Sequence, residues 1–135
     1  DLIASRLKAP VTTNQIEFSP LHLDPISDGT LDHALREGYK PMIWSPVGGG
    51  RLLKSDDEQI AALRSLLAET AQTYGLAGPA EAAIAFIARH PASGVPIVGS
   101  GKRDRIAGAI KAANTVLDRQ DWYAIVAKTN PSLFL

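Results

Sequence analysis

The chain has 135 residues, a usual length for one domain, and 45% of them are hydrophobic, which is enough for a packed core. Equal numbers of basic and acidic side chains, 14 each, give a formal net charge of zero, which argues against a general nucleic-acid surface. Without cysteine, the chain cannot form disulfides or use a thiolate. No apolar run reaches the roughly 18 residues of a membrane span and no signal-peptide pattern opens the sequence, so we expect a cytoplasmic protein without membrane contact.

The first predicted element is a strand at 11–18, where polar residues alternate with apolar ones. The segment behind it carries two prolines and a glycine, which predicts a turn. A short helix follows, whose start Thr30 or Asp28 can cap and whose end Gly38 can form in the left-handed conformation. A second short apolar strand is predicted at 41–45, and a run of three glycines comes shortly after it.

A long helix is predicted behind the glycines, because Ser55 and Glu58 fit a capping box and an apolar stripe then recurs every three or four residues up to Gly75. The remaining sequence predicts a helix at 77–91, a strand at 95–99 and two more helices at 102–114 and 117–128. Strands that alternate with helices indicate a parallel sheet. The pattern fits either an open doubly wound sheet or part of a (β/α)₈ barrel.

Both architectures bind ligands at the carboxyl ends of their strands, and all three predicted strands end there in polar or glycine-rich loops. The third loop runs into the start of a helix, where free N–H groups and the helix dipole favour an anion. Lys102 and Arg105 lie beside that start. The stretch is not a P-loop, since Pro96 stands where its first glycine belongs. The residues alone fit two alternatives, a phosphate-binding site and an ordinary turn between a strand and a helix.

The glycine triplet likewise allows a flexible surface loop or the close approach of a pyrophosphate. The histidines, at 22, 33 and 90, have no metal-ligand spacing, so we expect no metal site. Trp122 and Tyr123 are interpreted as the core and the rim of the last helix. The local sequence therefore predicts that a ligand binds at the carboxyl ends of the strands, but it does not identify that ligand.

Five stretches, in this order along nearly the whole chain, resemble the C-terminal half of the aldo-keto reductases: "NQIEFSP", "DGTLDHAL", "MIWSPVGGGRL", "IVGSGKRDRI" and "RQDWYAI". The resemblance is strongest to a bacterial subgroup of NADP-dependent oxidoreductases. It implies an α/β fold, namely the last three β/α units and the final helix of a (β/α)₈ barrel. Residues 1–135 would then form one partial barrel, a single domain whose N-terminal half is missing.

The resemblance also implies a binding site for NADP(H). Gln15 would bond the nicotinamide carboxamide from the end of its strand, and Trp44 would stack on the nicotinamide ring. The pyrophosphate would lie along Ser45, Gly48, Gly49, Gly50 and Arg51, and the adenosine 2′-phosphate would be held by Ser100, Gly101, Lys102 and Arg105. On this interpretation, side chains at 48–50 would collide with the bound dinucleotide.

Some positions depart from the family. Many members carry Lys where Gly99 stands, and Asn or Glu where this chain has Gly108 and Ala109. The catalytic Asp, Tyr, Lys and His of the family lie on the first four strands, so the chain is expected to hold no catalytic residue and to be inactive alone. The parent enzyme would reduce a small-molecule carbonyl substrate. The alternative is a non-catalytic half-barrel that binds a nucleotide or phosphate. In either case we expect self-association or pairing with the missing N-terminal half.

Overall fold

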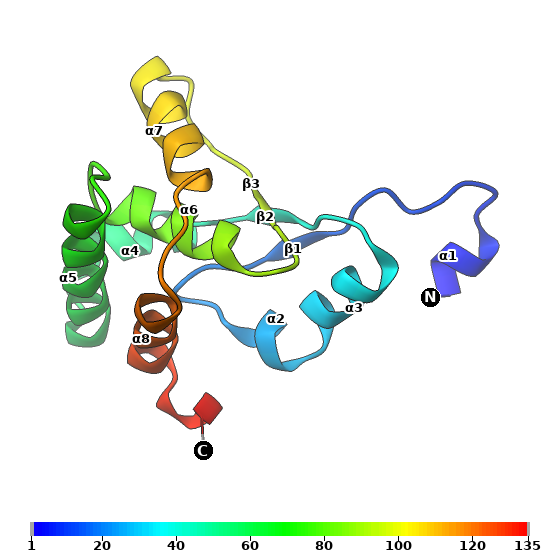
Figure 1. The fold of residues 1–135 in the computed structure, drawn as a ribbon, viewed down its shortest axis with the longest axis horizontal. Helices are drawn as coiled ribbons and strands as arrows, with labels where there is room; N and C mark the ends of the chain where they lie inside the picture. The colour runs from blue at the N-terminus through cyan, green and yellow to red at the C-terminus, as the bar shows by residue number, and fades with distance from the viewer. Residues whose placement is uncertain (1, 135) are drawn as a thin grey trace.

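The computed structural model describes residues 2–134, which fold into a small parallel sheet with helices packed against it (Figure 1). The elements in chain order are α1 (Leu2–Arg6), β1 (Gln15–Glu17), α2 (Asp24–Ser27), α3 (Thr30–Glu37), β2 (Met42–Trp44), η1 (Gly48–Gly50), α4 (Arg51–Lys54), α5 (Glu58–Thr73), α6 (Pro79–Arg89), β3 (Val95–Pro96), α7 (Arg103–Ala113), α8 (Arg119–Thr129) and η2 (Pro131–Phe134).

The three strands pair in the order β1-β2-β3, and both pairs are parallel. This confirms the predicted parallel sheet, but the outer strands are shorter than their sequence patterns. The first strand covers Gln15–Glu17 instead of 11–18, and the third covers only Val95–Pro96. Both outer strands have one hydrogen-bonding neighbour in the sheet. The N–H groups of Val95 and Ile97 donate to the carbonyls of Pro41 and Ile43, so the nitrogen of Pro96, which carries no hydrogen, faces away from β2.

Local capping signals account for the start of α5 and both ends of α3. Asp28 Oδ1 accepts from the N–H of Thr30 at 2.8 Å, and Gly38 ends α3 in the left-handed conformation with φ 74°. The predicted capping box at the start of α5 is wrong, because Asp57 is the N-cap and accepts from the N–H groups of residues 59 and 60. Ser55 instead bonds the N–H of Asp57 at 3.2 Å. A carboxylate already at the N-cap satisfies the donors that a capping box would serve.

Two helical turns were not anticipated from the sequence. α2 lies within the segment expected to be a turn, and α4 lies between the glycines and α5. Each has four residues, which is too short for an apolar periodicity to stand out.

The core lies between the sheet and the helices on one side of it. Ile43 on β2 is completely buried, as are Leu67 on α5 and Phe86 on α6. The ring of Phe86 lies 5.6 Å from that of Phe18, and it stacks on Trp122 of α8 at 5.1 Å and 12°. These contacts join the end of β1 to α6 and α8 in one apolar cluster.

The opposite side of the sheet is uncovered in this chain. The register places Met42 opposite both Gln15 and Val95, and Trp44 opposite Glu17. We call these five residues the open face. Met42, Trp44 and Val95 are 37%, 41% and 48% exposed. β2 therefore packs against helices only through its Ile43 side.

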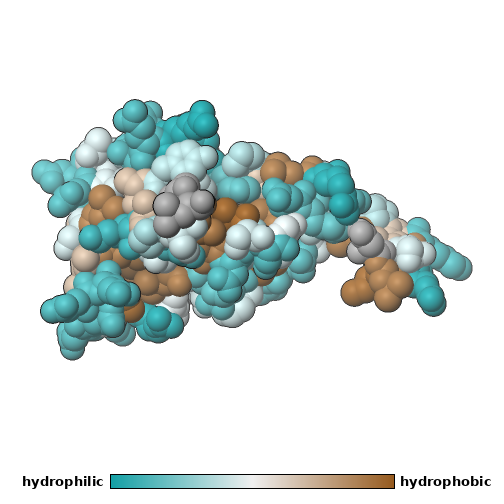
Figure 2. Space-filling view, turned by 90° about the horizontal axis from the view of Figure 1, so that it is seen from below, coloured by the Kyte–Doolittle hydropathy of each residue, from teal (hydrophilic) through white to brown (hydrophobic). Residues whose placement is uncertain are grey.

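The described helices include none that is both long and apolar enough to cross a membrane. α1 stands apart from the remaining helices (Figure 1), and its Leu2 and Ile3 are 76% and 72% exposed. The space-filling view shows apolar surface at the tip of the molecule where α1 lies (Figure 2). The N-terminal segment thus adds apolar surface without contributing to the core.

Candidate functional site

The open face and two loops meet at one edge of the sheet. β2 runs into the loop that begins at Ser45, and β3 runs into the loop that begins at Ile97. In parallel strands these carboxyl ends share an edge. Trp44 is the last residue of β2, whereas Gln15 opens β1 and does not end it as expected. Both side chains belong to the open face, two residues apart along the strands.

The loop after β2 has an unusual backbone. Ser45 has φ 52°, and Gly48, Gly49 and Gly50 have φ 58°, 63° and 90°, all in the left-handed region. The N–H of Gly48 donates to the carbonyl of Ser45 at 2.8 Å, and that of Gly50 to Val47 at 3.0 Å. Three consecutive left-handed positions require glycine for conformational reasons alone.

A second reason applies at Gly48. A Cβ at this position would lie 2.8 Å from the Cδ1 atom of Leu21, which belongs to the loop after β1. A Cβ at Gly49 or Gly50 would meet no described atom within 4 Å. The backbone conformation and the contact with Leu21 therefore explain the glycine triplet without a ligand. The close approach of a ligand to Gly49 and Gly50 stays a prediction.

Arg51 lies in a depression that the other predicted pyrophosphate-binding residues do not line. It lines a cavity of about 290 Å³ together with Leu21 of the loop after β1, the α5 N-cap Asp57, and residues of α5 and α8, namely Gln59, Ile60, Leu63, Lys128 and Thr129. A carboxylate and a second cation thus share this depression with Arg51. Among the predicted phosphate-binding residues, Arg51 alone lines this cavity.

The loop after β3 leads into the start of α7. Lys102 is the N-cap residue, and its N–H donates to Ser100 Oγ at 3.3 Å. Lys102 therefore lies just before the first turn, while Arg105 lies within it. Within residues 2–134, no group accepts from the N–H groups of residues 103–105. Two exposed cations thus flank three free donors, the arrangement that favours an anion at a helix N-terminus.

The departure at Gly108 has a structural cause. A Cβ at this position would lie 2.1 Å from Glu81 Oε1 of α6. Glu81 is held there because its Oε2 accepts from the N–H of Ala77 at 2.8 Å. Ala109 is also buried, at 6% exposure. These two positions of α7 therefore pack inside the chain.

The tyrosines do not supply a proton donor to the open face. The Tyr74 hydroxyl donates to Asp121 Oδ2 at 2.6 Å and accepts from the N–H of Asp118 at 2.7 Å, which joins α5 to the start of α8. Burial, followed by the bond to Asp121, raises the pKa of Tyr74. The Tyr39 hydroxyl lies 3.0 Å from Nδ1 of His33 on α3. Among residues 2–134, no three His, Asp or Glu side chains gather as metal ligands.

Three members of the open face, namely Met42, Val95 and Glu17, were not predicted as site residues from the sequence. Glu17 lies opposite Trp44 and is its ionisable neighbour. The alternation that put Gln15 and Glu17 on one side of the strand was the signal that could have found it.

The sequence model of the aldo/keto reductase family matches residues 2–130 of the chain. The chain is 38% identical over 124 residues to the oxidoreductase YdhF of Escherichia coli, covering 92% of the chain and 41% of that protein. It is 40% identical over 116 residues to a 6-dehydroglucose reductase of Novosphingobium aromaticivorans, covering 86% of the chain and 38% of that protein. The chain therefore spans about two fifths of these relatives.

The structure is similar to a thermostable aldo-keto reductase, Tm1743, solved with the inhibitor epalrestat. The TM-score is 0.76 at 21% identity, over 92% of this chain and 42% of that one. This likeness shows the fold, which is part of a (β/α)₈ barrel built from parallel strands with helical connections. Together with the family match along residues 2–130, it establishes that the chain belongs to the aldo/keto reductase family.

Proposed function

We propose that this chain is the cofactor-binding C-terminal portion of an NADPH-dependent aldo-keto reductase that reduces a small carbonyl compound. Members of the family generally use nicotinamide cofactors, and the relatives that match are named as oxidoreductases and reductases. The observation that carries the proposal is the start of α7, where three free N–H groups lie between Lys102 and Arg105. That start follows the carboxyl end of β3, at the same edge as Trp44.

The open face fits the other end of a dinucleotide. Trp44 is 41% exposed, so a flat ring can stack on its indole. Gln15 belongs to the same face and offers an amide that can both donate and accept. Ser45 and Gly48–Gly50 follow Trp44 in the sequence. This order suits a pyrophosphate that joins the nicotinamide end of the cofactor to its adenosine end.

These residues position the cofactor and leave the chemistry to other groups. Carbonyl reduction needs a hydride, which the bound nicotinamide supplies, and a proton donor close to the carbonyl oxygen. The open face holds a carboxylate, Glu17, but no tyrosine or histidine. We therefore assign the proton donor to barrel units outside this chain. A non-catalytic nucleotide-binding half-barrel is the alternative.

The first prediction tests the 2′-phosphate contacts. Replacing Lys102 and Arg105 with Ala should weaken NADPH binding by about 3 kcal/mol, because each charge-assisted contact contributes about 1.5–3 kcal/mol. NADH binding should stay nearly unchanged, since it lacks the 2′-phosphate. The measurement is equilibrium titration of both cofactors into the enzyme that contains these residues. Arg103→Ala, in the same turn, is the matched control, and equal losses for the two cofactors would refute the assignment.

The second prediction separates the reductase from the binding module. The isolated 135-residue chain should oxidise NADPH with reactive aldehydes only at the background rate, because a missing general acid costs about 10²–10⁴-fold. The same assay on a version extended by the N-terminal barrel units should show turnover. If the extended protein binds NADPH yet reduces no carbonyl compound, the binding-module alternative is correct. Turnover by the short chain above its Lys102→Ala/Arg105→Ala control would contradict the assignment of the proton donor.

A further inference from the structure

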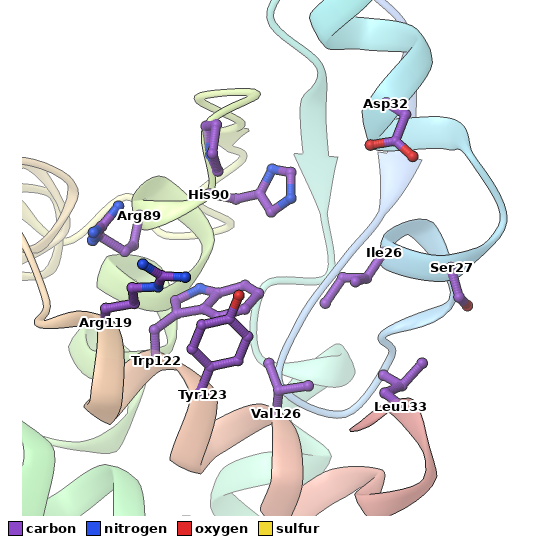
Figure 3. A pocket seen from close by; sticks show the side chains of 11 residues that line it. Ile26, Ser27, Asp32, Arg89, His90, Arg119, Trp122, Tyr123, Val126 and Leu133 are labelled. Atoms are coloured by element: carbon purple, nitrogen blue, oxygen red, sulfur yellow. The ribbon is translucent and has the colours of Figure 1, made fainter. Parts of the chain in front are cut away.

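A cavity of about 640 Å³ lies on the helix-covered side of the sheet, away from the open face. Its volume is within the range of small-molecule sites. α2 and α3 form one wall, and the end of α6 together with α8 forms the other (Figure 3). The residues that line both walls belong to this chain. Figure 2 shows apolar surface on this side, among charged groups.

One wall carries two cations. Arg89 is held in place because its Nε donates to the carbonyl of Leu117 at 2.7 Å, which leaves its terminal amino groups for another acceptor. The Arg119 guanidinium lies 5.9 Å from the centre of the Tyr123 ring. Neither guanidinium forms an ion pair with a carboxylate of residues 2–134. Two arginines without a carboxylate on one wall favour an anionic group in the cavity.

The same wall has a rigid aromatic corner. The Trp122 indole stacks on Phe86, and its Nε1 donates to the Phe86 carbonyl at 3.0 Å, so the ring cannot turn freely. The Tyr123 ring stands at 88° to the indole, with centroids 5.2 Å apart. Figure 3 shows both rings at the cavity beside Arg119. A flat ring can rest against one of them and meet the other edge to face.

The facing wall offers acceptors. Asp32 of α3 and the hydroxyl of Ser27 line it, and Figure 3 shows the Asp32 carboxylate directed toward the cavity. The ring of His90 lies between this carboxylate and the arginines in the same view. Burial lowers the pKa of His90, which favours the neutral form of the ring. The cavity thus has a cationic side, an aromatic corner and an anionic side.

We propose that this cavity binds a small aromatic carboxylate that also carries a hydroxyl or amino group. The carboxylate of the ligand lies at Arg89 and Arg119, and its ring packs into the corner formed by Trp122 and Tyr123. Its hydroxyl or amino group donates to Asp32. The site is separate from the cofactor residues and does not depend on the proposed reductase activity.

The test is calorimetric titration of the chain with 4-hydroxybenzoate, with the uncharged 4-hydroxybenzamide as matched ligand. Saturable binding is expected for the acid, and the amide should bind at least tenfold more weakly, which corresponds to about 1.4 kcal/mol. Arg119→Gln should weaken binding of the acid by a similar factor. Arg119 is chosen because its ring contact can be lost without removing a hydrogen bond, unlike Arg89. The indole N–H resonance of Trp122 should shift on binding.

Three results would overturn the proposal. The first is no saturable binding at millimolar acid, and the second is equal affinity for acid and amide. The third is loss of binding in the Lys102→Ala/Arg105→Ala variant but not in Arg119→Gln, which would place the acid at the start of α7. Asp32→Ala sharpens the test, because it should lower the affinity for 4-hydroxybenzoate more than that for benzoate.

Discussion

The two sides of the sheet differ although they share the same strands. Ile43 is fully buried under α6 and its neighbours, while Met42 and Trp44, on either side of it in sequence, are 37% and 41% exposed. One side therefore has a complete core made by the chain itself. The other presents apolar side chains at the place where an intact barrel would have its interior. The difference shows that helices of this chain pack against one side of the sheet, whereas no described helix packs against the side that forms the interior of an intact barrel.

The largest expected effect concerns the open face as an association surface. The chain should form species heavier than its own 14.4 kDa, because exposed apolar side chains and unpaired strand edges recruit other chains. A second copy or the remaining barrel units can cover them. Sedimentation of Met42→Gln/Trp44→Gln/Val95→Thr should show a shift toward monomer. Val116→Thr, at a site 73% exposed in the loop after α7, is the matched control. A monodisperse, cooperatively folded monomer of the unmodified chain would show that the open face needs no cover.

A pair of neighbouring substitutions measures the difference between the sides directly. Ile43→Ala should lower the free energy of unfolding by about 2–5 kcal/mol, because it leaves a cavity in the core. At protein concentrations low enough to keep the chain monomeric, Met42→Ala should cost less, since over a third of Met42 is already in water and less apolar area is re-exposed. Urea denaturation followed by circular dichroism gives both values. Where Ile43→Ala does not fold, Ile43→Val should still cost about 0.5–1.5 kcal/mol. Equal costs at the two positions would mean that the open face is covered.

The smallest effect is a pH dependence on the covered side. His90 Nδ1 accepts from the N–H of Ala92 at 3.2 Å, and burial lowers the pKa of His90, while Asp32 opposes this more weakly. Arg89 and Arg119 face the ring from the same wall of the cavity. Below about pH 6.5 the unfolded chain takes up the proton more readily than the folded one. Stability should therefore fall as the pH decreases below this value.

Urea denaturation at several pH values checks the His90 prediction. The decrease should be smaller in His90→Gln than in the unmodified chain. An unchanged slope in His90→Gln would show that another group causes the acid sensitivity.

The sequence by itself determined the order of the strands and the longer helices, the parallel sheet and the family. These features follow from signals between near neighbours in the chain. Glycine at 38 ends α3 because it adopts the left-handed conformation easily, and the apolar stripe of α5 is buried as its spacing indicated. Tyr123 is exposed as expected of the rim of α8, whereas Trp122, expected in the core, packs against it only partly buried. A pattern that lies within one helix or strand predicts that element in any fold that contains it.

Only the tertiary structure decided which residues meet across elements. It ended β3 at Pro96, which the apolar sequence alone would have extended, and it gave the cap of α5 to Asp57. It placed Arg51 in a depression with α5 and α8, and it set Gly48 against Leu21. It also formed the cavity on the covered side from segments that lie far apart in the sequence. These features depend on the directions of side chains brought together by packing, which no local pattern encodes.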